Sequence, residues 1–260
     1  MLSACEKGDT EAWRTFLSHY TPMVSRLLEV YAPQLGEDAR KSLWQEALQA
    51  LVAEDYSHLR GFDHQAEREF LMDLKWFVLE LAYRRHLGRD AEAPRSPDSV
   101  RSRLDGRPIA HQEIILLSLS GYSRAAIEKV LTAPGTLVAT ALAPVTGKES
   151  VAATTPAIEP LDWLKILPQV RAARKPECPP PRAFVRILDG QASWYDKTPA
   201  ENHMAACLHC LETWATLREA DFLRRDTIPL AGPEVEVYLS AVGLAAAPAA
   251  RPWTARLFGR

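Results

Sequence analysis

The sequence lacks any run of 18 or more apolar residues, and its opening, MLSACEKGDTEAWR, carries charges where the apolar part of a signal peptide would lie. We therefore expect a cytoplasmic protein without a membrane span. The sequence also lacks a charge imbalance, because 31 Lys and Arg stand against 33 Asp and Glu, a net charge of -2. This excludes a global attraction to nucleic acid or anionic membranes, so any DNA binding must depend on local basic patches.

Sequence motifs of catalysis are missing as well. There is no glycine-rich phosphate loop, no nucleophile elbow and no paired-carboxylate motif, and the Ser, His and Asp residues show no recognisable spacing. We therefore expect a binding protein rather than an enzyme, with no catalytic residues.

Cysteine is scarce, with 4 in 260 residues, but three of the four are grouped with a histidine in the last third of the chain. On a continuous helix, His203 and Cys207 are four positions apart and Cys210 is three further on, so the three side chains would share one face. Cys178 supplies a fourth donor from 25 residues upstream. Reduced cysteines at such spacing favour metal over disulfides, and structural Zn²⁺ takes four Cys and His ligands.

We therefore predict a structural zinc site made of Cys178, His203, Cys207 and Cys210. The alternative is a set of unrelated buried cysteines on helix faces. His209 points off the ligand face, and Cys5 is expected to be a small apolar or exposed residue far from the site. Catalytic zinc would need a nearby acid or base, but Glu212 is expected on a solvated helix surface.

Apolar periodicity predicts an all-α protein without strands. Helices are expected from Ser3, from near Pro22, from Asp38 to Glu54 and from about Ala66 to Leu87. Pro- and Gly-rich stretches then divide the chain into units. The predicted division is a helical domain 1–92, a linker 93–108, a helical unit 109–146, a linker 147–176 with a short docking helix around Trp163 to Leu167, a zinc-binding unit 177–225 and a tail 226–260.

The C-terminal unit resembles a known family. The segment Cys178-Pro-Pro-Pro-Arg-Ala-Phe-Val-Arg-Ile-Leu-Asp-Gly, followed by the HxxxCxxC run, is similar to the zinc-binding anti-sigma domain over about residues 178–217. In that family a helical unit wraps a sigma factor and blocks its access to RNA polymerase. The resemblance implies the same four zinc ligands, Cys178, His203, Cys207 and Cys210.

The N-terminal helices resemble region 2 of extracytoplasmic-function sigma factors. GDTEAWRTFLSHYTPMV at 8–24 is similar to its opening, EDARKSLWQEALQAL at 37–51 to its polymerase clamp helix, and LRGFDHQAEREFL at 59–71, with the basic cluster at 84–89, to its promoter-melting helix. The resemblance implies polymerase contacts at Leu43, Gln45, Glu46, Leu48 and Leu51. It implies DNA contacts at Arg68, Lys75, Trp76, Arg84 and Arg85.

Two observations support a different interpretation of these helices. Aromatic residues at helical spacing are usually core, so Trp76 is also a candidate for simple packing. Residues 1–91 hold eleven Lys and Arg against fifteen Asp and Glu, a formal charge of -4, which is unfavourable for a phosphate-binding surface unless the acids lie on another face.

The middle unit resembles the helix-turn-helix of sigma region 4. IILLSLSGYSRAAIEKVL at 114–131 matches the supporting helix, with Ser123 as a predicted N-cap, and PGTLVATAL at 134–142 falls where a recognition helix would start. No Lys or Arg occurs between Lys129 and Lys148. Because base and phosphate contacts need such side chains, we predict a degenerate helix-turn-helix whose last helix packs against protein.

Two functions follow as hypotheses. The first is a transcription regulator that resembles an extracytoplasmic-function sigma factor. It would bind core RNA polymerase, and promoter DNA is a further candidate partner. A fused structural-zinc unit would regulate it through an intramolecular or intermolecular sigma/anti-sigma contact. The second is a protein-interaction adaptor or anti-sigma-type regulator on a sigma-like scaffold that has lost promoter recognition.

Overall fold

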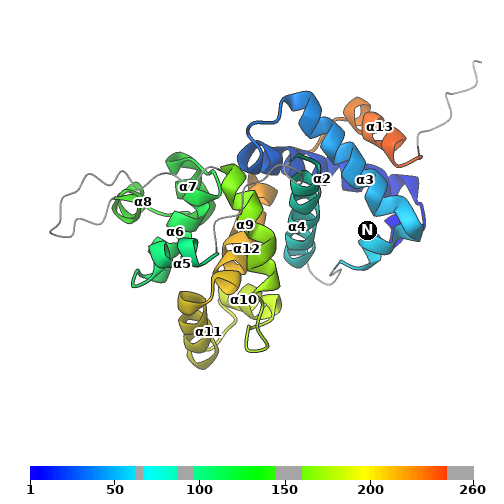
Figure 1. The fold of residues 1–260 in the computed structure, drawn as a ribbon. Helices are drawn as coiled ribbons and strands as arrows, with labels where there is room; N and C mark the ends of the chain where they lie inside the picture. The colour runs from blue at the N-terminus through cyan, green and yellow to red at the C-terminus, as the bar shows by residue number, and fades with distance from the viewer. Residues whose placement is uncertain (63–66, 87–96, 144–159, 245–260) are drawn as a thin grey trace, which may run out of the picture.

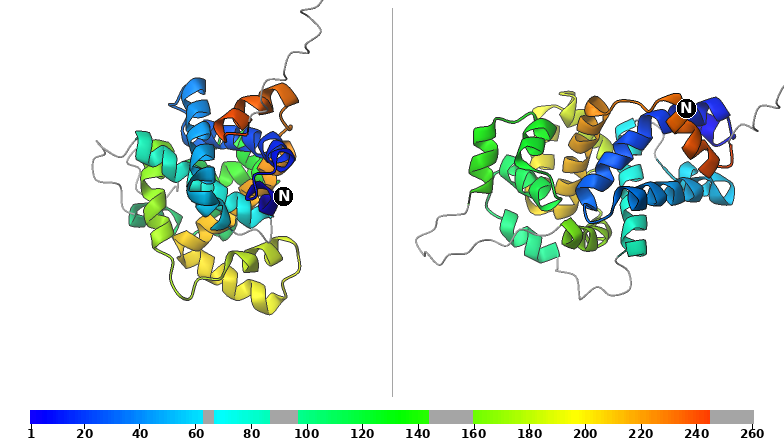
Figure 2. Two further views of the ribbon diagram at one scale, coloured as in Figure 1. Left: turned by 90° about the vertical axis from the view of Figure 1, so that its right-hand side faces the viewer. Right: turned by 90° about the horizontal axis from the view of Figure 1, so that it is seen from above.

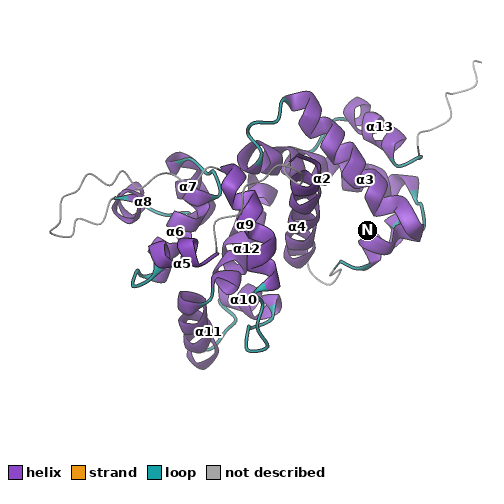
Figure 3. Ribbon diagram, viewed as in Figure 1, coloured by secondary structure: helices purple, strands orange, loops and turns teal. Residues whose placement is uncertain are grey.

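The computed structural model describes residues 1–62, 67–86, 97–143 and 160–244 (Figure 1). These residues form thirteen helices and no strand (Figure 3), which confirms the all-α prediction. Within the same ranges, no helix is both long and apolar enough to cross a membrane. The predicted basic residue Arg89 lies outside the described residues, as does the segment 245–260 of the predicted tail.

Four helices form the N-terminal part: α1 (Leu2–Cys5), α2 (Thr10–Tyr31), α3 (Glu37–Arg60) and α4 (Glu67–His86). Asp9 caps α2 by accepting a hydrogen bond from the Ala12 backbone N–H at 2.9 Å. The prediction of a new helix near Pro22 is wrong, because α2 continues through this proline and buries residues on both sides of it. The helix predicted from Ala66 to Leu87 is confirmed by α4.

Helix α3 is interrupted where the sequence predicts its end. Glu54, Asp55 and Tyr56 have φ angles of 48°, 53° and 61°, which is the left-handed region that non-glycine residues rarely occupy. The helical hydrogen bonding resumes after them and ends at Arg60. The last turns of α3 contact α4, where the His58 and Phe77 ring centroids are 5.3 Å apart.

The rest of the chain adds nine helices: α5 (Pro97–Leu104), α6 (Ile109–Leu119), α7 (Arg124–Leu131), α8 (Gly135–Leu142), α9 (Pro160–Ala172), α10 (Pro181–Leu188), α11 (Trp194–Ala206), α12 (Leu208–Asp226) and α13 (Gly232–Ala241). Ser123 accepts a hydrogen bond from the Ala126 N–H, so the predicted N-cap is confirmed. Helices α6, α7 and α8 pack on one another in the predicted middle unit.

Segments expected to be linkers or tail contain packed helices. Val100 and Leu104 of α5 are fully buried, and so is Ile166 of α9, the helix predicted to dock in the second linker. The side chain of Trp163 lies outside the described residues. Helix α13, in the expected tail, packs against α2 and α3 (Figure 2). Apolar residues within these Pro-rich stretches explain the difference, because burying them stabilises short helices that local propensity alone would not.

One continuous core joins the predicted units. It runs from Cys5 to Val242 and includes buried residues of the N-terminal, middle and C-terminal helices. Helix α12 lies at its centre, in contact with α2 and α4 on one side and with α6 and α7 on the other (Figure 1). A second, smaller core surrounds Cys178 and Phe184 at the other end of α12. The units at 1–92 and 109–146 are therefore packed on a shared C-terminal helix.

Glu113 of α6 is buried against α12 in this shared core, with 3% of its surface exposed. Its carboxylate lies 3.4 Å from the Arg218 guanidinium. Burial raises the pKa of Glu113 to about 7, although the attraction of Arg218 opposes this. Between about pH 4.5 and pH 7, Glu113 is mostly ionised in the unfolded chain and mostly protonated in the folded chain. The free energy of unfolding therefore falls as the pH rises through this window.

We predict that Glu113→Gln removes this penalty. The variant should be more stable than the parent at pH 8, by about 1–3 kcal/mol, and close to the parent at pH 5. Chemical denaturation at both pH values measures the difference. Glu29→Gln, at an exposed glutamate of α2, is the matched control and should change stability by less than about 0.5 kcal/mol. An equal effect of Glu113→Gln at both pH values would contradict the prediction.

Candidate metal centre

The four predicted ligands lie together. The donor atoms of Cys178, His203, Cys207 and Cys210 are all within 4.8 Å of one another. Cys178 comes from the turn before α10, His203 from the last turn of α11, and Cys210 from the first turn of α12. Cys178 and Cys210 are buried, and the other two are partly buried. The sequence therefore identifies a real cluster at the junction of three helices.

The local backbone differs from the one that the spacing predicts. Cys207 has φ -123° and ψ 111°, so it is extended, and it both ends α11 and caps the start of α12. The prediction that His203, Cys207 and Cys210 share the face of one continuous helix is thus wrong. The break turns α11 away from α12, and the donor atoms converge across this corner while Cys178 approaches from the turn before α10.

The geometry fits a metal ion. The sulfur atoms of Cys178 and Cys207 are 3.9 Å apart, and a tetrahedral site with metal–sulfur bonds of about 2.3 Å requires about 3.8 Å. The His203 Nε2 atom is buried and has no hydrogen-bond partner among the described residues. A buried polar atom without a partner is costly, and a metal bond at this nitrogen would satisfy it. The cluster can therefore hold a metal ion such as zinc.

One thiol of the cluster, that of Cys207, is prepared for deprotonation. A hydrogen bond with the Cys210 side chain, assisted by contacts with Cys178 and His203, lowers the pKa of Cys207 to about 4 despite partial burial. The same hydrogen bond and burial raise the pKa of Cys210. The Lys175 backbone N–H donates to the Cys178 sulfur at 3.2 Å and orients it. Because metals bind the thiolate form, one ligand is available near neutral pH without further change.

Nearby candidates lie outside the cluster. The His209 Nδ1 atom is 3.3 Å from the Val170 carbonyl oxygen of α9, so its ring is turned to another helix, as predicted. Cys5 is fully buried in the large core, and burial raises its pKa to about 12. The expectation that Glu212 lies on the solvated surface is wrong, because only 1% of it is exposed.

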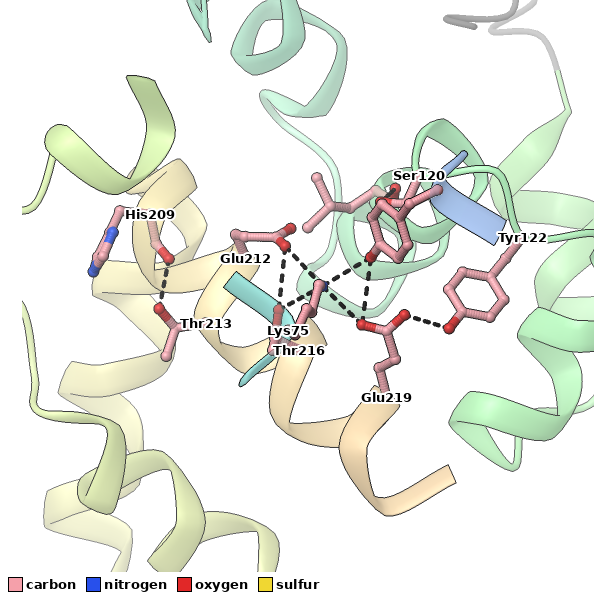
Figure 4. A network of polar contacts seen from close by, with 10 residues as sticks. Lys75, Ser120, Tyr122, His209, Glu212, Thr213, Thr216 and Glu219 are labelled. Atoms are coloured by element: carbon pink, nitrogen blue, oxygen red, sulfur yellow. Dashed lines mark hydrogen bonds and ion pairs between the residues drawn. The ribbon is translucent and has the colours of Figure 1, made fainter. Parts of the chain in front are cut away.

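Glu212 belongs to a buried polar network that α12 carries into the core (Figure 4). The Lys75 Nζ atom of α4 lies 2.7 Å from the Glu219 carboxylate and 3.2 Å from the Glu212 carboxylate. It also donates hydrogen bonds to the Tyr31 and Thr216 hydroxyls, both at 2.8 Å. Tyr122, which follows α6 in the chain, donates a hydrogen bond from its hydroxyl to the Glu219 carboxylate. One lysine thus joins α4 and α2 to α12, and Tyr122 joins the middle helices to the same carboxylate.

The network determines the protonation of its members. Burial opposes the charge on Lys75, but the two carboxylates outweigh it and raise the pKa of the ammonium group. Burial and the neighbouring carboxylates also raise the pKa of the Tyr31 and Tyr122 hydroxyls far above the usual value. Both tyrosines therefore stay neutral, and their hydroxyls can donate to the carboxylates of α12 at any physiological pH.

The residues implied as DNA contacts fall into two groups. The first group is covered: Lys75 and Trp76 are each 6% exposed, and Arg68 forms ion pairs of 2.6 Å with Asp189 and Asp221 of the C-terminal unit. Lys75 and Trp76 are not accessible to DNA in this arrangement, because α12 and α9 pack against α4, so a DNA contact at either residue stays a prediction. The second group, Arg84 and Arg85, is exposed, with side chains 72% and 61% accessible.

The residues implied as polymerase contacts are also divided. Leu43, Leu48 and Leu51 face the core and are at most 2% exposed, so they are not part of the accessible surface of α3, and their contact with polymerase stays a prediction. Their spacing is that of the buried face of an amphipathic helix. Gln45 and Glu46 are partly exposed, and Glu46 pairs with Arg85 of α4 at 2.8 Å.

Sequence reasoning missed the network around Lys75, although a signal for it was present. Glu212, Thr216 and Glu219 are spaced by four and three residues, so they form a polar stripe along one helix face. Such a stripe usually faces water. Its burial requires a cation from elsewhere, and nothing near α12 in the sequence indicates that Lys75 is this partner.

Comparison of the chain with protein-family models, with curated proteins and with solved structures finds no match.

We predict that the purified chain holds one equivalent of metal and that Cys207→Ser loses most of it. The melting temperature should fall with the loss, because the small core around Phe184 is stabilised by the metal. Elemental analysis and thermal unfolding with and without a chelator measure both effects. His209→Gln removes the adjacent histidine that is not a ligand and should retain the metal. Equal metal loss in both variants would show that the assignment of ligands is wrong.

We also predict that Lys75→Met destabilises the fold by about 3–5 kcal/mol, because two buried carboxylates lose their cation. Adding Glu219→Gln should recover part of this loss in a double-mutant cycle. Lys41→Met removes a lysine that is 53% exposed and pairs with Glu37 on the same helix. Its loss should leave the stability close to that of the parent, because an exposed ion pair contributes little. A Lys75→Met variant as stable as the Lys41→Met control would contradict this account of the network.

Proposed function

We propose that this protein is a transcription regulator of the extracytoplasmic-function sigma type, held in a closed form by its own C-terminal unit. The proposal combines the sequence resemblance with one observation. Helix α12 begins in the metal centre, where it carries Cys210, and continues into the core, where Glu212 and Glu219 bind Lys75 of α4. The metal centre and the sigma-like helices are therefore connected by a single helix.

The metal in this proposal is structural zinc. Three thiols and one imidazole form the donor set that zinc prefers, and four protein ligands leave no position for a substrate. The unit around the site has a core of only six buried residues, which is too small to hold three helices firmly without a cross-link. Zinc would fix the corner between α11 and α12 and so fix the direction in which α12 enters the large core.

The closed form accounts for the covered residues of α4. Arg68 is held by Asp189 and Asp221, and Lys75 and Trp76 are packed beneath α12 and α9. In this proposal the α4–α12 contact is the intramolecular sigma/anti-sigma contact. Core RNA polymerase is the main partner, and movement of α12 would expose the rest of α4 to promoter DNA. The protein acts through binding energy and carries out no reaction.

The alternative function is a protein-interaction adaptor on the same scaffold, and α8 favours it. This helix buries Val138 and Ala141 and presents Thr136 and Thr140 to solvent. It has no cation along its length. A helix without Arg, Lys, Asn or Gln is poorly suited to reading duplex DNA, so specific promoter recognition by this unit is not part of either proposal.

The test uses the full chain and a variant that weakens closure. Asp189→Asn combined with Asp221→Asn removes both partners of Arg68 at partly exposed positions, so the fold should survive. We predict that the parent chain captures purified core RNA polymerase and that the double variant captures more and gives more promoter-dependent run-off transcript. Asp226→Asn, at the exposed end of α12, should behave like the parent.

The outcomes separate the two functions. Capture of polymerase by none of the chains would contradict the sigma-type proposal and favour the adaptor. Equal capture and equal transcription by the parent and the double variant would show that the C-terminal unit does not restrain the N-terminal helices.

A further inference from the structure

A groove of about 490 Å³ lies between α10 and α11, at the lower end of the molecule in Figure 1. Its lining comes only from these two helices and from the turns before them, so the groove lies apart from the buried network around Lys75. His203 is part of the lining and is also a candidate metal ligand. Most lining residues retain solvent access, so the groove is open in the closed form of the chain.

Small and aliphatic side chains form the apolar part of the groove, with Ala183 and Ile187 on α10 and Ala200 on α11. Tyr195 also lines it and is 86% exposed, and the neighbouring Trp194 is 71% exposed. Of the Phe, Tyr and Trp side chains that the structure describes, only these two are exposed. Two adjacent exposed aromatic residues contribute little to the fold, and Tyr and Trp are enriched among the residues that dominate binding at protein interfaces.

Basic side chains stand beside this apolar surface. Residues 171–188 hold five Lys and Arg and one Glu, a formal charge of +4, in a chain whose net charge is -2. Arg182 and Arg186 are exposed and lie one turn apart on α10, and Arg186 lines the groove. Neither guanidinium forms an ion pair within the part of the chain that the structure describes. The Asp196 carboxylate in the lining instead accepts a hydrogen bond from the Ser193 hydroxyl at 2.9 Å.

We propose that this groove docks an acidic segment of a partner protein. Aliphatic side chains of the segment fill the space between α10 and α11, Tyr195 and Trp194 pack against them, and carboxylates of the segment pair with Arg182 and Arg186. Because His203 lines the groove, the segment docks next to the metal centre. The inference goes beyond the proposed function, since neither the sigma-type role nor the adaptor role assigns a ligand to this surface.

The composition of the groove favours a peptide over a nucleic acid. Its apolar part consists mainly of methyl and methylene groups, which suit aliphatic side chains better than flat bases. Glu177 and Asp196 are also part of the lining. Both would repel a continuous phosphate backbone, whereas a peptide can place its carboxylates opposite Arg182 and Arg186 alone.

The experiment measures the binding of a fluorescein-labelled peptide of about ten residues, alternating Asp and Leu, to the metal-loaded full chain by anisotropy. We expect Arg186→Glu to weaken binding by about tenfold and Tyr195→Ser by about three- to tenfold. The Arg186→Glu variant should also bind a peptide of alternating Lys and Leu more tightly than the parent does. All substituted side chains are exposed, so the melting temperature should stay at the parent value.

Two matched controls lie outside the groove. Arg225→Glu reverses an exposed cation at the end of α12, and Ile228→Ala shortens an apolar side chain that is 84% exposed. Both variants should bind the acidic peptide with the affinity of the parent. A loss in Arg225→Glu as large as that in Arg186→Glu would mean that only the overall charge of the chain matters, and it would overturn the inference.

Three further results would overturn the inference: no binding of the acidic peptide by the parent chain, parent affinity in both Arg186→Glu and Tyr195→Ser, or equal binding of a peptide that alternates Asp and Ser. Equally tight binding of a single-stranded DNA, with the same variant effects, would show a general anion site in place of a docking groove. Capture of core polymerase is a separate readout, so the proposed function and this inference can fail independently.

Discussion

The arrangement of the helices depends on the burial of Lys75 between Glu212 and Glu219. A lysine enclosed in a protein interior must have a counter-charge, and here α12 supplies two carboxylates within 3.2 Å. The cluster has two carboxyl groups for one ammonium group, and burial raises the pKa of the Glu212 carboxyl group. The Tyr31, Tyr122 and Thr216 hydroxyls hydrogen-bond to its members. Such a network contributes little net stability compared with an apolar core of the same volume. Its main effect is geometric, because α12 can dock only where these donors and acceptors meet.

This constraint explains why the chain has one large core although its sequence suggests separate units. Helix α12 must supply hydrogen-bond acceptors to Lys75 of α4 on one side and to the Tyr122 hydroxyl, next to α7, on the other. It therefore occupies the space between the N-terminal and middle helices, and its apolar residues join both to a common core. The metal centre lies at the start of the same helix. A metal ion there would limit how far α12 can tilt or slide, which is the physical basis of the proposed closed form.

Local patterns in the sequence predicted local structure well. The helix predicted from about Ala66 to Leu87 and the Ser123 cap depend on spacing along a few turns, and the structure contains both. The predicted cluster of Cys178, His203, Cys207 and Cys210 is also present, although it does not lie on the face of one helix. Features that depend on distant contacts were not accessible. The extended backbone at Cys207 has no Gly or Pro to signal it, and α13 lies in a stretch whose composition resembles a tail. From the sequence alone Lys75 has the character of a surface cation, because its carboxylate partners Glu212 and Glu219 lie more than 130 residues away.

In the proposed closed form, α12 transmits the state of the metal centre to α4. Amide hydrogen exchange of the full chain, with metal bound and after chelation, measures this coupling. We expect faster exchange after chelation in three places: around the ligands, along α12 and in the part of α4 around Lys75. The start of α2 should remain protected. Faster exchange confined to residues 178–207, with α12 and α4 unchanged, would show that the metal centre is a local cross-link and would contradict the claim.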